Sequence, residues 1–242
     1  MKKIIEKEKI LDKAILNILI YLQSEILKEA LPEMRNKFFD EEKLKKYYVL
    51  LSGIDFACKK VLRYGVYFDK FYPDKKIIKE SEALEHHIHA YLEDLTILCN
   101  KIVVFLGSLK NDLKKAVEDR KSMEASFDFL IKKVEDNFEK IAKARNSHHH
   151  KGLKFIDKNV IESQLASAML ENGEKLGINF KKEYFENKEK DSFKEAKNTW
   201  IKIALKNNKQ ISRLVEKIIE KNERFVYDLL KIEPISDKLK NK

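Results

Sequence analysis

The segment 145–152, with the sequence RNSHHHKG, combines the side chains that cleavage of a phosphodiester bond requires. Arginine is always charged and donates hydrogen bonds in a fork that fits a phosphate group. Histidine exchanges protons near neutral pH and can act as a general acid or base. Without a metal, one histidine would take the proton of a ribose 2′-OH or donate one to the 5′-oxygen leaving group, while Arg145 neutralises the charge of the phosphorane. Two copies facing each other across a two-fold axis would supply the base and the acid from different chains.

Arg145-Asn146 followed by His150 resembles the R-x4-6-H signature of HEPN-domain ribonucleases, in its common form Arg-Asn-x-x-x-His. The resemblance covers about residues 80–172. It implies an all-α bundle that acts as a homodimer and cuts RNA without a metal or other cofactor, leaving a 2′,3′-cyclic phosphate. It also implies that Arg145 and His150 are catalytic and that Asn146 orients the phosphate. Proteins of this family commonly serve as toxins of toxin–antitoxin pairs or as abortive-infection effectors in antiviral defence.

The register of the motif leaves a choice between two histidines. The family often has an apolar residue before the catalytic histidine, whereas this sequence has His149 there. On a helix His149 shares a face with Arg145, and His150 has the family spacing. We predict that His150 is catalytic, with His149 as its substitute. Contacts to RNA are predicted for the neighbouring side chains, Lys143, His148 and Lys151.

A second group of histidines lies at 86, 87 and 89. On a helix His86 and His89 share a face, and Glu93 follows four residues after His89. That spacing is compatible with a transition metal, but the sequence offers no strong further ligand and no cofactor is predicted. These histidines would otherwise line an RNA or dimer cleft, or belong to an ordinary helix surface. A metal site that joins both histidine groups requires them to meet in space.

The composition predicts an all-α protein. Only six Gly and three Pro occur in 242 residues, and a sheet protein needs more of these turn-forming residues. Lys, Glu, Leu, Ile and Ala favour helices instead, and 43% hydrophobic residues can form a core. We expect a single all-α domain over 1–242, with a HEPN-like core at about 80–172 and a C-terminal helical extension over 190–242.

Apolar periodicity places the helices that position the motif. The stripe Phe127, Leu130, Val134, Phe138 and Ile141 continues to Arg145, so the guanidinium lies on an otherwise apolar face. Such a placement is costly unless the charge meets an anion or forms part of a site. The segment Glu171–Asn198 is predicted to be a connector with short helical pieces. Helices are predicted over about 4–30, 41–66, 80–117, from 121 to the motif with Gly152 as a C-terminal signal, over 160–170, and over 208–232.

The charge balance is compatible with RNA as a partner. Fifty basic and 40 acidic residues give a net charge of +10, and only six of the basic residues are Arg. Residues 101–154 hold thirteen Lys or Arg and eight Asp or Glu, so this part carries +5 of that charge. Aromatic residues interleave with Lys and Arg over 38–76, which is typical either of base stacking or of core packing at a helix end. A solvated lysine surface explains the charge equally well.

Several other functions lack their motifs. The sequence has no Gly-rich phosphate loop, no paired CxxC and no HExxH. Its longest uncharged run is Ala14–Ser24, which is shorter than a membrane span, and no signal-peptide cleavage site follows the N-terminus. We therefore predict a cytoplasmic protein that does not act at a membrane, with RNA, a second copy of itself, and an antitoxin or other defence-system protein as partners. The alternative is a non-catalytic helical protein that binds RNA or serves as a protein-interaction scaffold.

Overall fold

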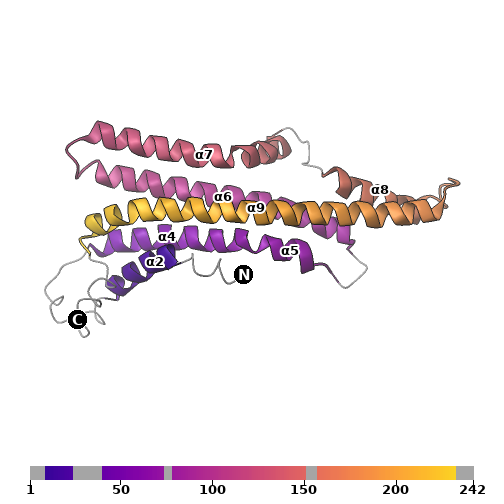
Figure 1. Cartoon of the computed structure of the whole chain (residues 1–242), viewed down its shortest axis with the longest axis horizontal. Coiled ribbons are helices and arrows are strands. Elements are labelled where there is room, and N and C mark those ends of the chain that lie inside the picture. The colour runs from indigo at the N-terminus through magenta and orange to yellow at the C-terminus, as the bar shows by residue number, and fades with distance from the viewer. Residues whose placement is uncertain (1–8, 24–39, 74–77, 151–156, 233–242) are drawn as a thin grey trace. The chain divides into compact units, whose positions relative to one another are not determined.

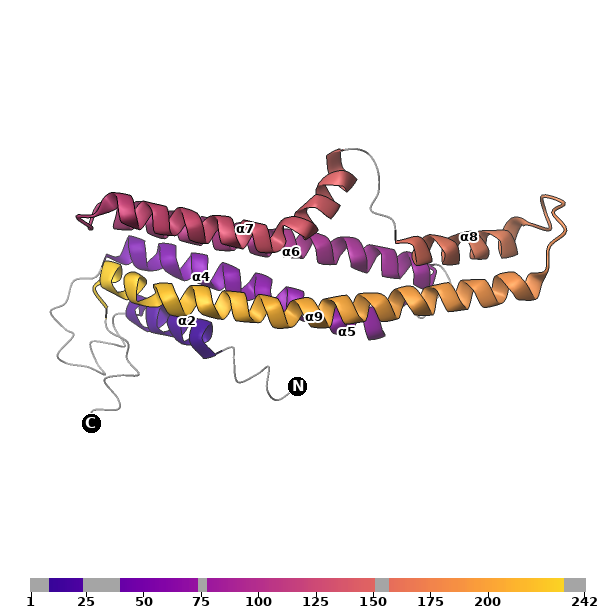
Figure 2. The same cartoon turned by 45° about the horizontal axis from the view of Figure 1, so that its top comes forward.

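The structure is a computed structural model that describes residues 9–23, 40–73, 78–150 and 157–232, with the side chains of 9, 10 and 140–150 excepted. Every regular element within these ranges is a helix (Figures 1 and 2). The predicted all-α fold is therefore confirmed. The helices are α2 (Lys9–Leu22), α4 (Glu41–Leu62), α5 (Tyr64–Lys70), α6 (Glu80–Leu113), α7 (Arg120–His150), α8 (Lys158–Asn172) and α9 (Lys182–Leu230).

The prediction of a connector over Glu171–Asn198 is wrong. Helix α9 begins at Lys182 and continues for 49 residues to Leu230. The first part of α9 has few large apolar residues, so its periodicity is weak in the sequence. It is held instead by polar contacts to α8, where Ser163 Oγ donates to the Glu189 carbonyl at 3.0 Å and Lys188 pairs with Glu162 at 2.6 Å.

The single helix predicted over 41–66 is also wrong, because α4 ends at Leu62 and α5 starts at Tyr64. At the junction the Arg63 amide donates to the Lys60 carbonyl at 3.2 Å, which is the tighter spacing of a 3₁₀ turn. Gly65 follows, and a Cβ atom there would lie 3.3 Å from a methyl group of Leu205. The glycine thus allows the start of α5 to approach α9 closely.

The chain divides into two compact units, and each is built from segments far apart in the sequence. Unit 1 comprises Met1–Lys59, Ile97–Phe138 and Gln210–Lys242. In it, parts of α4, α6, α7 and α9 run side by side (Figures 1 and 2). Its contacts join the N- and C-terminal parts of the chain, since Asn17 Nδ2 of α2 donates to the Tyr227 hydroxyl of α9 at 3.0 Å.

Two observations in unit 1 bear on the sequence predictions. Phe127, Val134 and Phe138 of α7 are buried, and the Phe127 ring lies 6.4 Å from that of Phe225. The apolar stripe that leads toward Arg145 is therefore confirmed up to Phe138. Helix α9 buries a face wider than a coiled-coil seam, which indicates packing inside a bundle: Ile211, Val215, Ile218, Ile219, Asn222, Val226 and Tyr227.

Unit 2 comprises Lys60–Thr96 and Glu139–Lys209. Its core is aromatic: Tyr91 of α6 lies 5.1 Å from Tyr64, 5.7 Å from Phe68 and 6.4 Å from Trp200, measured between ring centroids. Tyr64 and Phe68 belong to the run in which aromatics and lysines interleave, and both are buried. For these two rings core packing is the correct interpretation, and base stacking is not.

Candidate active site and its surroundings

The motif lies in the last turns of α7. The backbone is helical through His150, two positions before Gly152, which was predicted to signal the end of this helix. In a regular helix positions 145 and 149 are one turn apart, and position 150 lies about 140° around the axis from position 145. The backbone thus places Arg145 and His149 on one face. The side chains of Lys143, Arg145, Asn146, His148, His149 and His150, and Lys151 as a whole, lie outside the described residues.

Helix α8 begins soon after the motif and is fixed at its first turn by Asp157. The Oδ1 atom of Asp157 accepts hydrogen bonds from the amides of Asn159 at 2.9 Å and Val160 at 3.2 Å, which is the geometry of an N-cap. Its Oδ2 atom accepts from Trp200 Nε1 at 2.9 Å. One carboxylate therefore caps α8 and holds it against α9, seven positions after His150.

The histidines of α6 have separate roles. His87 Nε2 lies 2.7 Å from the Phe71 carbonyl, so the ring donates there, and it stacks on Tyr67 at 6.4 Å. His87 therefore anchors the end of α5. His86 is exposed, and its ring lies 6.1 Å from that of His87.

His89 faces the beginning of α8. Its Nε2 atom lies 3.7 Å from Glu85 Oε1, and Gln164 Nε2 of α8 donates to Glu85 Oε2 at 2.8 Å. Together with Asp157 and Val160 these residues line a shallow depression. Of the α6 histidines, His89 thus lies beside the start of α8, and the Glu85 carboxylate orients its ring.

The metal alternative gains no support. Among the residues that the structure describes, no group of three or more His, Cys, Asp or Glu side chains is close enough to hold a metal ion. Glu93 is exposed on α6, and the carboxylate that lies near the His89 ring is that of Glu85. Whether the two histidine groups meet in space stays a prediction, since His148 lies outside the described side chains.

A cleft of about 600 Å³ opens elsewhere in unit 2, between the start of α6, α8 and α9. Three buried serines line it, Ser81, Ser163 and Ser167. Its rim carries Lys79 and Lys190 but also three carboxylates, Glu80, Glu171 and Glu189. Lys79 pairs with Glu171 at 2.8 Å. This balance of charge does not fit a polyanion, so we do not assign RNA to the cleft.

A group of basic residues on α9 was missed by the sequence predictions. From Ala196 to Val215 the chain contains no Asp or Glu, although it has 40 acidic residues in 242 positions. Lys202, Lys206 and Lys209 are exposed there. The signal in the sequence is the acid-free stretch itself.

Comparison of the chain with protein-family models, with characterised proteins and with solved structures finds no match. No helix in the described part of the chain is long and apolar enough to span a bilayer. A helical bundle by itself hosts many functions, so the function of this chain is inferred from the chemistry of its site.

Proposed function

We propose that the chain is a metal-independent endoribonuclease of the HEPN type that acts in antiviral defence or growth arrest in the cytoplasm. One observation carries the proposal: the sequence Arg-Asn-x-x-x-His occupies the last turns of a long helix, α7. The next helix, α8, begins at Lys158 with Asp157 as its N-cap. This context agrees with a signature that lies between later helices of an all-α bundle.

The reaction would be a transesterification within the RNA strand. A histidine removes the proton of the 2′-OH, the 2′-oxygen bonds to phosphorus, and the bond from phosphorus to the 5′-oxygen breaks. A second proton donor protonates the leaving 5′-oxygen, so the products are a 2′,3′-cyclic phosphate and a 5′-hydroxyl end. Arg145 would stabilise the extra negative charge of the phosphorane. The base and the acid would come from His150 or His149 of two copies in a homodimer.

The decisive experiment uses purified protein with EDTA and a labelled single-stranded RNA. We expect cleavage that yields a cyclic phosphate, and loss of that cleavage in Arg145→Ala and in His150→Ala. The matched controls are Arg120→Ala, at the other end of the same helix, and His86→Ala, an exposed histidine of the same unit. Circular dichroism must show equal helicity in all four variants.

Three outcomes would count against the proposal. They are cleavage of a fully 2′-deoxy substrate, wild-type cleavage by Arg145→Ala, and absence of products from RNA. If His149→Ala loses activity while His150→Ala keeps it, the catalytic histidine is His149, which shares a helical face with Arg145. An antitoxin or other partner would be sought by its ability to suppress the cleavage.

A second function, binding of RNA without cleavage, is favoured by the exposed lysines of α9. They supply a surface for phosphates that does not depend on Arg145 or on a histidine. A salt-sensitive complex with RNA that accumulates no product would support this second function over the first.

A further inference from the structure

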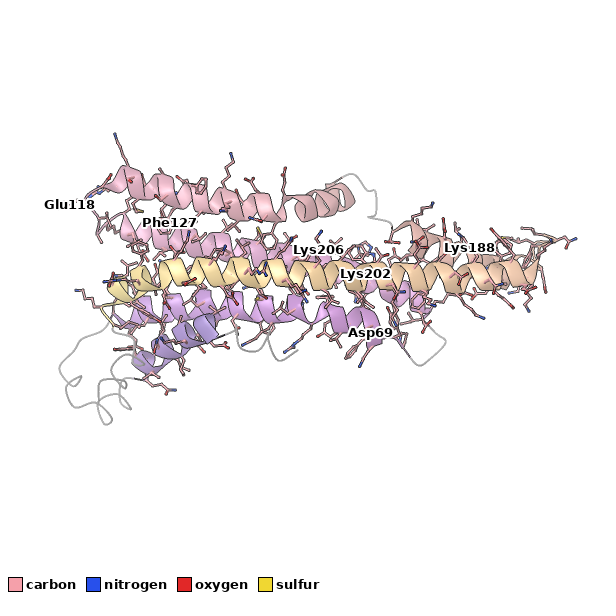
Figure 3. The ribbon with its side chains drawn as sticks, viewed as in Figure 1. Asp69, Glu118, Phe127, Lys188, Lys202 and Lys206 are labelled. Carbon is pink, nitrogen blue, oxygen red and sulfur yellow. The ribbon has the colours of Figure 1, made fainter. Side chains whose placement is uncertain are left out.

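The middle of α9 presents lysines on one face and buries the opposite face. Lys202, Lys206 and Lys209 follow one another at spacings of four and three, so they lie along one side of the helix. The three are exposed (Lys202 and Lys206 are labelled in Figure 3). The opposite face is occupied by buried residues, Ala196, Trp200, Ala204 and Asn208. The orientation of the lysines is thus fixed by the core of unit 2.

No carboxylate of the described residues pairs with these three lysines, whereas several other lysines of unit 2 form ion pairs. Lys60 pairs with Asp94 at 2.8 Å, Lys79 with Glu171 at 2.8 Å and Lys188 with Glu162 at 2.6 Å. Lys197, just before the three, lies 3.6 Å from Asp69. For Lys202, Lys206 and Lys209 the described part of the chain provides no ion-pair partner. A surface built only to be soluble would mix both signs of charge.

An arginine joins the lysines from the junction of α4 and α5. Asn208 Nδ2 donates to the Leu62 carbonyl at 3.0 Å, and Gly65 abuts Leu205. Arg63 lies between these two contact points, is exposed, and has no ion-pair partner among the described residues. Since the chain has only six arginines, an unpaired one beside three unpaired lysines strengthens the concentration of positive charge.

We infer that Arg63, Lys202, Lys206 and Lys209, here called the α9 basic face, bind the phosphate backbone of single-stranded RNA. The inference deepens the proposed function and rests on it for the identity of the partner. Lys202 to Lys209 spans about 10 Å of helix, enough to meet two or three phosphates. Flexible lysines act as point charges and read no sequence, so this face would hold RNA irrespective of its bases.

The surroundings favour RNA over a lipid surface. A helix that lies in a membrane interface needs an exposed apolar face beside its cationic residues. In the segment 196–209 the large apolar residue with substantial exposure is Leu205, at 51%. The other large apolar residues of this segment are buried or half-buried, so little remains to enter a bilayer.

The test measures binding of a labelled single-stranded RNA by fluorescence anisotropy over a range of salt concentrations, in an Arg145→Ala/His150→Ala background so that no substrate is cut. Replacing Lys202, Lys206 and Lys209 by Gln should weaken binding at low salt at least tenfold. The slope of log K against log salt should become shallower by about 2, since each lost phosphate contact contributes about 0.7 on a single strand. Adding Arg63→Gln should weaken binding further.

The matched control removes the same charge from lysines that carry ion pairs. Lys43, Lys45 and Lys114 pair with Asp40, Glu41 and Glu124, and their replacement by Gln should leave affinity and salt slope within twofold of the parent. Equal effects of the two triple variants would overturn the inference, because net charge alone would then explain binding. Unchanged binding in the α9 triple variant would overturn it as well.

The outcomes separate this inference from the proposed ribonuclease activity. If the parent chain cuts no RNA yet loses affinity when the α9 lysines are replaced, the basic face stands and the enzyme does not. If cleavage depends on Arg145 but replacing the α9 lysines leaves RNA affinity unchanged, the ribonuclease activity stands and the α9 basic face does not. Vesicles with anionic phosphatidylserine should bind more weakly than RNA, and binding to vesicles without binding to RNA would overturn the inference.

Discussion

Trp200 Nε1 donates a 2.9 Å hydrogen bond to Asp157 Oδ2, and so ties the middle of α9 to the first residue of the α8 cap. The other oxygen of the same carboxylate accepts from two amides of α8. The relationship matters because Asp157 follows His150 by seven positions. These hydrogen bonds fix the position of the chain at Asp157, where α8 begins after the motif.

Asp157→Ala should therefore lower stability more than loss of an ordinary helix cap. It removes the cap, at about 1 kcal/mol, and also the hydrogen bond that Asp157 Oδ2 accepts from the Trp200 indole, at about 1–3 kcal/mol. Urea denaturation followed by circular dichroism measures the sum. Asp40→Ala is the matched control, since Asp40 caps α4 through the Lys43 amide at 3.0 Å and touches no tryptophan. Equal losses in the two variants would show that the Trp200 contact contributes nothing.

Buried tyrosines should make the fold sensitive to alkali. Burial raises the pKa of Tyr91 to about 12, and burial together with the Asp94 carboxylate raises the pKa of Tyr64 well above its ordinary value. Tyr47 shifts in the same direction through burial and Asp112. The folded state keeps these protons after the unfolded chain, with tyrosine pKa values near 10, has lost them. The stabilisation is complete below pH 10 and is lost as pH rises above it.

Urea unfolding between pH 7 and pH 11.5 tests this expectation, with tyrosinate absorbance recorded in parallel. The free energy of unfolding should fall above pH 10 by about 1.4 kcal/mol per pH unit for each protected tyrosine. Absorbance of the protected tyrosines should appear only when the protein unfolds. Tyrosinate signals from all nine tyrosines in the folded state at pH 10.5 would contradict the burial of these rings.

Two glycines should respond in opposite directions to alanine. A Cβ atom at Gly173 would lie 2.6 Å from the Met169 carbonyl oxygen and would also collide with the Phe180 ring. Because the carbonyl belongs to helix α8, Gly173→Ala should destabilise by about 1–3 kcal/mol. Gly107 lies inside α6 with no atom within 4 Å of its Cβ position, so Gly107→Ala should stabilise by about 0.5–1 kcal/mol. Thermal unfolding of both variants decides the signs.

The two cysteines should be unreactive in the folded protein. Cys58 and Cys99 are buried and form no disulfide. Burial, with a smaller effect of Glu135, raises the pKa of the Cys99 thiol to about 11. Since the thiolate is the reactive form, an aromatic disulfide reagent should label neither cysteine at pH 8 until denaturant is added. Labelling of Cys99 as fast as in the unfolded chain would contradict its placement.

The sequence by itself determined the helical class and the inward face of the first part of α7. These follow from a repeat of 3.6 residues, which is local and can be counted. The burial of Phe127, Val134 and Phe138 agrees with that count. The prediction that Arg145 and His150 cleave RNA rests likewise on residue type and spacing alone.

Only the tertiary structure decided what depends on partners distant in the chain. Helix α9 extends back to Lys182 because α8 supplies contacts that no local pattern reveals, such as Lys188 with Glu162. The acid-free stretch of α9 was visible in the sequence, but whether its lysines would be neutralised was not. Ion pairing depends on which carboxylates other helices bring within reach, and the packing of α5 against Leu205 places Arg63 beside these lysines instead of an acid. Helix formation is local, whereas compensation of charge is decided by packing.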